Sequence, residues 1–266
     1  MIGKIKFSLM LLLLVAILLL LLPFQLAALL LVKIGYNAPA ACLPVVFHRL
    51  FLFLFDIRLD LVGAFPKDRP LLIVANHVTW LDIVVLGSIA PLSFAAKSEM
   101  KSWPVFGSLA KLQRTVFINR SRRSKAGQQV DDIANRMEER QIIVLFPEGT
   151  TTDGNQLAPF KTPLFEAAKI ALNNSPVDTA LVQPVSICYT KLHGLPIGRA
   201  DRPHVAWPGE IGLGESFFPV LQQGALDVRV QLGVPIVLTE QSNRKIIARE
   251  SVASIRSMLD SSRGSG

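Results

Sequence analysis

Residues 71–82 read LLIVANHVTWLD. The first five, Leu71–Ala75, form a short and wholly apolar run, which is typical of a buried strand. Asn76 and His77 follow that run directly, and the apolar segment Leu81–Ile89 after them has the length of a helix. A strand that passes through a polar turn into a helix is the unit of an α/β sheet. Active sites of such sheets collect at the carboxyl ends of the strands.

The rest of the chain repeats this alternation of short apolar runs with helix-length segments. Polar and apolar residues alternate at positions 56–61, which predicts a strand with one face in water. Further strands are predicted at Ser93–Ala96, Thr115–Ile118, Ile142–Phe146, Leu181–Ile187 and Asp227–Leu232, and helices at Glu99–Leu112, Ser124–Arg140, Pro163–Asn173 and about Glu240–Leu259. At 266 residues the chain has room for one α/β domain and an appendage.

The appendage is an apolar segment at the N-terminus. Half of all residues are hydrophobic, and the uncharged run Phe7–Val32 exceeds the roughly 20 residues that span a bilayer core. Lys4 and Lys6 would also suit a cleaved signal peptide, but the apolar part of such a peptide is usually about 7 to 15 residues long. We therefore expect a membrane anchor at residues 1–55, a globular domain at 56–260 and a frayed tail at 261–266.

The topology of this anchor stays open at the level of sequence. Pro23 splits the first run and predicts a kink or a re-entrant turn there. A second apolar stretch, Leu43–Phe55, is too short for a comfortable span. It is either an interfacial helix or a buried core helix. Basic residues lie on both sides of the first run, so they do not set its orientation.

The charge of the chain predicts a negatively charged partner. The formal net charge is +8, and six basic residues cluster without an acidic one at Lys111, Arg114, Arg120, Arg122, Arg123 and Lys125. Anionic lipid at a membrane surface and phosphorylated substrates fit such a cluster, and a solvated basic surface is the alternative. No stacking or groove-reading motif accompanies it, so nucleic acid is not expected. Cys42 and Cys188 lack metal-ligand spacing, so no metal is expected.

His77 and Asp82 are the first candidates for chemistry. Asp82 falls in the first turn of the predicted helix, from where its carboxylate can turn back to the imidazole of His77. A carboxylate in that place would fix the tautomer of the ring and stabilise the imidazolium, which makes His77 a candidate general base. Taken alone, this spacing is weak evidence, and it favours a loop histidine followed by a helix-start carboxylate without a catalytic role.

Two further strand ends and the interior of one strand carry polar or unusual residues. FPEGT at 146–150 combines a glycine, which permits close approach of backbone, with the polar side chains of Glu148 and Thr150. FINR at 117–120 delivers the guanidinium of Arg120, which suits bidentate contact with phosphate. Pro184 lies inside an apolar strand and predicts an edge, a bulge or a wall there rather than a central ladder position.

In this order, NHVTWLD, FINR, FPEGT and the strand with Pro184 resemble the four motifs of the 1-acyl-glycerol-3-phosphate acyltransferase family. The resemblance covers roughly Asp56 to Leu238. It implies a mixed sheet flanked by helices, with His77 as the catalytic base and Asp82 as its orienting partner. The residues that it implies for binding the acceptor, called the shelf below, are Arg120, Glu148, Gly149 and Thr150.

The resemblance also implies a reaction. A fatty acyl group passes from acyl-CoA or acyl-carrier protein to the free hydroxyl of a lysophospholipid. The hydroxyl attacks the thioester directly, so no cofactor or metal is expected beyond that co-substrate. The chain has no GxSxG elbow, so no acyl-enzyme is expected. The first expectation is acylation of the sn-2 hydroxyl of lysophosphatidic acid to phosphatidic acid, in phospholipid biosynthesis.

Departures from the family pattern leave the acceptor head group open. Arg114 stands where glycine is frequent, and Thr151 stands where an arginine frequently follows FPEGT. The alternatives are another lysolipid, such as lyso-ornithine lipid, and a non-catalytic membrane protein that binds anionic lipid. Because thioester donors are cytoplasmic, we expect an inner-membrane protein whose catalytic domain faces the cytoplasm.

Overall fold

The computed structural model describes residues 3–67, 70–118, 133–137, 141–173, 179–209 and 212–264. Its strands are β1 (Ile57–Val62), β2 (Leu71–Ala75), β3 (Leu92–Lys97), β4 (Val116–Ile118), β5 (Ile142–Leu145), β6 (Ala180–Leu192), β7 (Leu195–Pro196), β8 (Leu226–Leu232) and β9 (Ile236–Leu238). Its helices are α1 (Lys4–Val32), α2 (Ala38–Leu54), α3 (Leu81–Ile89), α4 (Phe106–Leu112), α6 (Glu166–Asn173), α7 (Leu213–Gln223) and α8 (Arg244–Gly264). Short 3-10 helices are η1 (Ser98–Ser102), η3 (Thr162–Phe165) and η4 (Arg202–His204).

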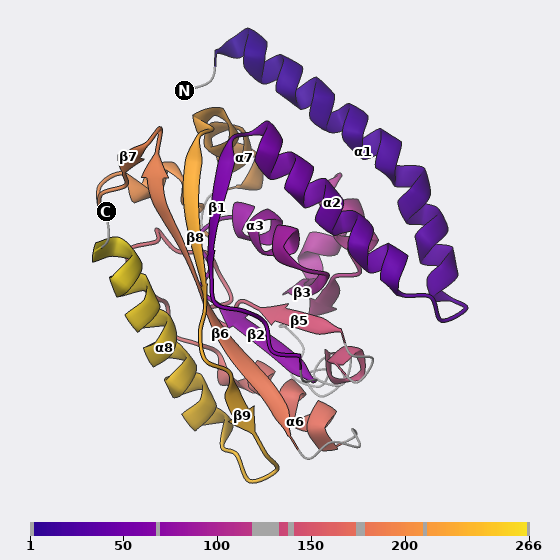
Figure 1. Ribbon diagram of the computed structural model, residues 1–266, viewed down its shortest axis with the longest axis vertical. Helices are drawn as coiled ribbons and strands as arrows, with labels where there is room; N and C mark the ends of the chain where they lie inside the picture. The colour runs from indigo at the N-terminus through magenta and orange to yellow at the C-terminus, as the bar shows by residue number, and fades with distance from the viewer. Residues whose placement is uncertain are drawn as a thin grey trace.

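The described strands form one mixed sheet in the order β1-β8-β6-β2-β5-β3-β4, with β7 and β9 also paired to β6. The pairs β6/β2, β2/β5, β5/β3 and β3/β4 are parallel, whereas β8 runs antiparallel to β6. Figure 1 shows α8 along one side of this sheet and α2 and α3 along the other. The predicted fold class, a mixed sheet flanked by helices, is confirmed.

Strand β2 lies at the centre of the sheet and is buried along its whole length. Leu71, Ile73 and Ala75 belong to the core under α2 and α3, whereas Leu72 and Val74 belong to the core on the opposite face. A strand that packs on both faces must be apolar at every position, because successive side chains point to opposite sides. This is the reason that residues 71–75 contain no polar residue.

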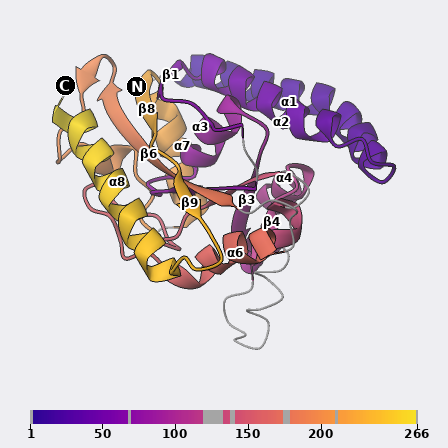
Figure 2. The same cartoon turned by 60° about the horizontal axis from the view of Figure 1, so that its bottom comes forward.

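The N-terminal segment folds as a helical hairpin, and its turn lies at residues 33–37. The predicted re-entrant turn at Pro23 is therefore wrong, because α1 continues through this proline. Figure 1 shows α1 bending instead, in agreement with the predicted kink, and Figure 2 shows α2 beside it. By length and composition α1 is sufficient to cross a membrane.

Both polar and apolar side chains attach the hairpin to the domain. Gln25, in the apolar helix α1, donates from Nε2 to the carbonyls of Ala40 (3.0 Å) and Leu112 (2.7 Å). In α2, Phe51 is buried in the domain core, whereas Phe53 on the outer face is 86% exposed. The interfacial and core interpretations of α2 thus each describe one face of the helix.

Several element predictions need correction. The helix predicted at Glu99–Leu112 is divided into η1 and α4, because Pro104 holds the residue before it, Trp103, in an extended conformation. Helix α8 continues to Gly264, so the predicted frayed tail is helical up to that residue. Helix α7, which contains Pro219, was not predicted. Of the helix predicted at Ser124–Arg140 the structure describes only residues 133–137, which are helical.

Pro184 lies in β6, a strand inside the sheet, so the edge interpretation is wrong. It falls where the antiparallel partner of β6 changes from β9, paired at residues 180–182, to β8, paired from Val185. The Pro184 carbonyl accepts a hydrogen bond from Gly233 N (2.8 Å) on that side. Since the nitrogen of a strand residue points to the same side as its carbonyl, the missing N–H falls in the gap between the two ladders.

Candidate active site

His77 and Asp82 meet at the carboxyl end of β2. The Nδ1 atom of His77 lies 2.8 Å from Oδ2 of Asp82, as the spacing of the two residues predicts. The carboxylate of Asp82 is completely buried, whereas the His77 side chain keeps 15% of its surface exposed. The side chain of Asp82 is thus enclosed in protein, whereas the ring of His77 stays accessible to a reactant.

The Asp82 carboxylate accepts hydrogen bonds from four groups. Besides the ring of His77, the backbone N–H groups of Val78 (2.7 Å) and Thr79 (3.0 Å) donate to Oδ2, and the Tyr189 hydroxyl donates to Oδ1 (2.8 Å). Because an ionised carboxylate only accepts, this set of donors stabilises its charged form. Burial, and next the charge of Asp82, raise the pKa of Tyr189 well above its ordinary value, so the phenol remains a donor.

This arrangement selects one tautomer of His77. Since the only role open to Nδ1 beside the carboxylate is that of donor, the lone pair of the neutral ring is on Nε2. The ring also stacks on Phe146 at a centroid distance of 3.9 Å and an interplanar angle of 14°. The contact fixes the plane of the ring, and Phe146 itself follows β5, the neighbour of β2. His77 is therefore arranged to accept a proton at Nε2.

Two residues that were not among the sequence-predicted site residues hold this arrangement together. Tyr189 is 107 positions from Asp82 and comes from β6. Asn76 is buried and joins the end of β2 to the same strand, since its side chain donates to Ile187 O (3.0 Å) and accepts from Ile187 N (2.8 Å). Asn76 stands next to His77 in the motif, but no sequence pattern marks a tyrosine on a distant strand.

Glu148 supports the backbone of the His77 loop. Its Oε1 accepts from His77 N and its Oε2 from Ala158 N, both at 2.7 Å, and the residue is only 2% exposed. Burial raises the pKa of Glu148 to about 7, against the opposing effect of the two backbone hydrogen bonds. Both carboxylate oxygens are thus directed to the protein backbone, and an acceptor contact with Glu148 stays a prediction.

Gly149, which is buried, and Thr150, which is exposed, follow Glu148 in the same loop. Gly149 has φ = +75°, which a residue with a side chain adopts only under strain, so the turn requires glycine. Thr150 is exposed, and Gly209 packs so closely on its hydroxyl that a Cβ at position 209 would collide with Oγ1. The backbone of Thr152 also donates to the carbonyl of His77 (3.0 Å). The FPEGT segment and the loop that carries His77 therefore form one connected structure.

The other predicted cations are placed differently. Arg120 and most of the basic cluster lie outside the described residues, so their predicted roles remain predictions. Arg114, which stands where glycine is frequent in the family, donates from Nη1 to Asn37 Oδ1 (3.0 Å) in the turn of the N-terminal hairpin. Among the described residues, no three His, Cys, Asp or Glu side chains gather as metal ligands would.

A histidine oriented by a buried carboxylate suits removal of a proton from a hydroxyl group. The ring stacking and the four hydrogen bonds on Asp82 hold the base in one orientation before a reactant arrives.

Comparison with known proteins agrees with this geometry. Residues 58–188 match the sequence profile of the family described as Acyltransferase. The chain is 45% identical over 261 residues to a lyso-ornithine lipid O-acyltransferase of Brucella abortus, covering 98% of this chain and 96% of that protein. It is 32% identical over 207 residues to a 1-acyl-sn-glycerol-3-phosphate acyltransferase of Neisseria meningitidis, covering 77% and 75%. The crystal structure of the 1-acyl-sn-glycerophosphate (LPA) acyltransferase PlsC of Thermotoga maritima has the same fold, with a TM-score of 0.60 at 19% identity over 86% of this chain and 82% of that one.

Proposed function

Because this chain belongs to the 1-acyl-glycerol-3-phosphate acyltransferase family, we propose that it transfers a fatty acyl group from a thioester to the free hydroxyl of lyso-ornithine lipid. The observation that carries the choice of acceptor is the 45% identity to the Brucella protein over nearly the full length of both chains. From its motifs alone, the sequence favours lysophosphatidic acid.

The residue after FPEGT supports the same acceptor. Ornithine is an amino acid, so its lipid head group contributes a carboxylate and an amine but no phosphate. Thr151 stands where an arginine is frequent in the family, and its neighbour Thr152 is bonded to the carbonyl of His77. A neutral residue here removes a cation that would bind phosphate and would repel an ammonium group.

The proposed reaction begins with the acceptor hydroxyl at Nε2 of His77. As the hydroxyl oxygen attacks the thioester carbonyl, His77 takes the hydroxyl proton and Asp82 stabilises the resulting imidazolium at 2.8 Å. The tetrahedral intermediate collapses by breaking the carbon–sulfur bond, and the proton held by the imidazolium passes to the departing thiolate. The products are the ester and the free thiol, and His77 is neutral again.

The residues around the base have separate roles in this proposal. Glu148 positions His77 by accepting a hydrogen bond from the backbone N–H of His77. The turn at Gly149 places the exposed Thr150 toward the acceptor. Arg120, which is not among the described residues, binds the acceptor in this proposal. Acyl-CoA or acyl-carrier protein supplies the acyl group, with no other cofactor.

The hairpin of α1 and α2 fits an enzyme whose substrates reside in a membrane. The outer faces of these helices carry large apolar side chains, among them Leu12 (66% exposed), Leu20 (67%) and Phe53 (86%). Such faces contribute favourable free energy when they enter lipid. We place the catalytic domain on the cytoplasmic side of the inner membrane, because thioester donors are made there.

A panel of acceptors tests the proposal. The full-length protein in mixed micelles is given a radiolabelled acyl thioester, supplied as acyl-CoA or acyl-carrier protein, with lyso-ornithine lipid or lysophosphatidic acid. We expect labelled product from lyso-ornithine lipid at a kcat/KM at least about tenfold above that for lysophosphatidic acid, which corresponds to about 1.4 kcal/mol. Transfer to lysophosphatidic acid alone would overturn the choice of acceptor, and the absence of transfer to either would overturn the acyltransferase proposal.

A further inference from the structure

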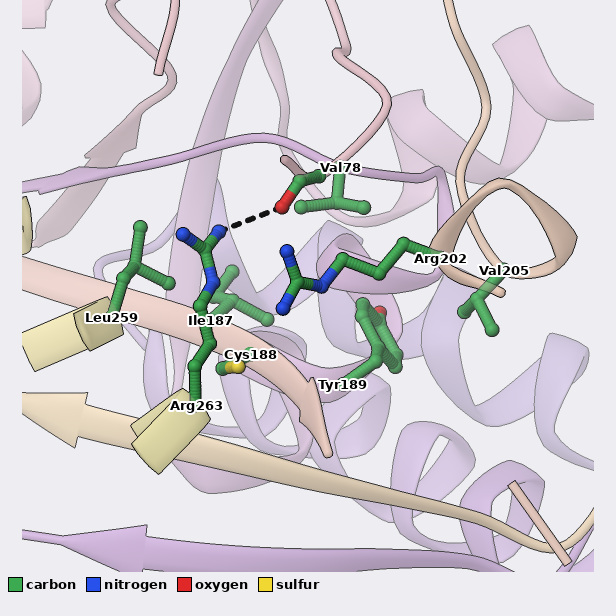
Figure 3. Close-up of a pocket in the computed structure, with 9 residues that line it drawn as sticks. Val78, Ile187, Cys188, Tyr189, Arg202, Val205, Leu259 and Arg263 are labelled. Carbon is green, nitrogen blue, oxygen red and sulfur yellow. Dashed lines mark hydrogen bonds between the residues drawn. The ribbon is translucent and has the colours of Figure 1, made fainter. Parts of the chain in front are cut away.

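Two arginines converge on a small cavity beside the loop that carries His77. The cavity has a volume of about 20 Å³ and is partly open to solvent. Figure 3 shows the guanidinium groups of Arg202 and Arg263 facing each other across it, with Cys188 between their side chains. The remaining wall is formed by Val78, Gly154, Ile187, Tyr189, Val205 and Leu259. We call this cavity the arginine cleft.

No carboxylate among the described residues forms a direct ion pair with the arginines of the arginine cleft. Neither guanidinium lies within 4 Å of a described carboxylate oxygen. The charge of Asp153 acts on Arg202 only without direct contact, and both carboxylate oxygens of Asp153 accept hydrogen bonds from Asn155. Burial raises the pKa of the Cys188 thiol, so the group between the arginines is neutral. Burial, and next the charge of Arg263, lower the pKa of Arg202, and an anion bound between the two guanidinium groups would offset their repulsion.

The hydrogen bonds of the two arginines are also incomplete. Arg263 donates from Nη2 to Gly154 O (2.7 Å) and from Nη1 to Asn155 O (3.4 Å), and Arg202 donates from Nη1 to the side-chain oxygen of Asn155 (2.9 Å). The Nε of Arg263 is buried and has no partner. Buried donors in native structures nearly always have an acceptor, so an unpaired Nε beside a second guanidinium indicates a missing oxygen ligand. The paired bonds to 154 and 155 keep both side chains in place.

The position of the arginine cleft connects it with the reaction. Val78 lines the cleft with its side chain, and its backbone N–H binds Asp82. Tyr189 lines the cleft as well and donates its hydroxyl to the same carboxylate. The carbonyl of Val78 accepts from Trp207 N (2.9 Å), in the loop that follows Arg202 and Val205. A ligand in the cleft would therefore contact Val78 and Tyr189, the residues that hold the Asp82 carboxylate.

We propose that Arg202 and Arg263 bind one oxyanion end group of a reactant, a carboxylate or a phosphate, in the arginine cleft. The enclosed volume is about that of one water molecule, so it admits one oxygen of such a group, and the open side leaves room for the rest of the reactant. Paired guanidinium donors match the oxygens of both groups. This inference rests on the proposed function, because both sources of the oxyanion are substrates of that reaction. One source is the carboxylate of the ornithine head group, and the other is the phosphate of the thioester donor.

Anion binding is measured first, without turnover. Inorganic phosphate and acetate are titrated into the detergent-solubilised full-length protein, and the melting temperature is followed. We expect saturable stabilisation of the wild type, and a half-saturating concentration about tenfold higher in Arg202→Gln and Arg263→Gln. Arg256→Gln is the matched control, since Arg256 is exposed on the same helix as Arg263. Equal responses of wild type and Arg202→Gln would overturn the site, whether or not the protein transfers acyl groups.

Kinetics then identifies the source of the oxyanion. Arg202→Gln is assayed with the acceptor and with the thioester varied in turn. We expect KM to rise about tenfold for one of them, with kcat within about threefold of the wild type. A rise for the lysolipid assigns the head-group carboxylate, and a rise for the thioester assigns the donor phosphate. Unchanged KM values for both would refute the proposal. Arg202→Lys keeps the positive charge but loses the planar guanidinium group, so its KM should lie between the values of the wild type and Arg202→Gln.

Discussion

Replacing Asp82 by asparagine would remove a charge from the centre of the site and leave the shape of the site almost intact. The remaining amide oxygen can take the place of Oδ2 and accept from His77 Nδ1, Val78 N and Thr79 N. The new NH2 group then faces the Tyr189 hydroxyl, whose oxygen can accept from it. The loop and the strands should therefore keep their conformation, and the change should act on the reaction.

The size of the effect follows from the charge that forms on His77. The imidazole becomes imidazolium during proton transfer, with its Nδ1 2.8 Å from Asp82 Oδ2. The charges are spread over the ring and the carboxylate, so their centres are about 4 Å apart, and the attraction is about 4 kcal/mol at an effective dielectric constant of about 20. At about 1.4 kcal/mol for each factor of ten, kcat should fall by about a thousandfold.

Transfer of a radiolabelled acyl group to the lysolipid, measured as kcat and KM in mixed micelles, checks this value. Tyr189→Phe is the companion variant, because it removes one hydrogen bond from Asp82 and leaves the charge. Its kcat should fall only about tenfold, in keeping with the loss of one hydrogen bond to a charged group. Both variants should melt within a few degrees of the wild type. If Asp82→Asn retained more than a tenth of the wild-type kcat, or lost no more than Tyr189→Phe, the charge would not have the role described.

Further predictions concern the residues around this pair. The pKa of Glu148 is raised from 4.5 to about 7 in the folded protein, so folding takes up a proton between these values, and the free energy of unfolding should fall by up to about 3 kcal/mol as pH rises through that window. Glu148→Gln should remove this slope from melting curves recorded at pH 4.5 to 8; an unchanged slope would contradict the assignment. Gln25→Leu should cost about 1–3 kcal/mol, seen as a lower melting temperature, because the Leu112 carbonyl loses its buried donor, and kcat should not change; a lost kcat would place Gln25 in the site. Gly209→Ala should displace Thr150 and raise KM for the lysolipid severalfold; an unaltered KM would show that this contact does not shape the shelf.

Local patterns in the sequence were sufficient for much of the fold. The apolar run Leu71–Ala75 is β2, the segment Leu81–Ile89 is α3 with the predicted bounds, and the long apolar run at the N-terminus is α1. The pairing of His77 with Asp82 was also predictable. These features depend on residues within one turn or one strand, where spacing alone determines which side chains share a face.

The tertiary structure decided which distant segments complete the site. Tyr189 reaches Asp82 from 107 positions away because β6 lies beside β2 and extends beyond its end, and Arg263 approaches Arg202 because α8 ends next to the loop after the shelf. Glu148 shows the same limit, since its position in FPEGT did not reveal that both carboxylate oxygens would bind backbone N–H groups of other segments. A single sequence indicates local conformation through its hydrophobic periodicity and steric preferences. Contacts between distant residues depend instead on the order of the strands in the sheet, and the packing of the whole chain sets that order.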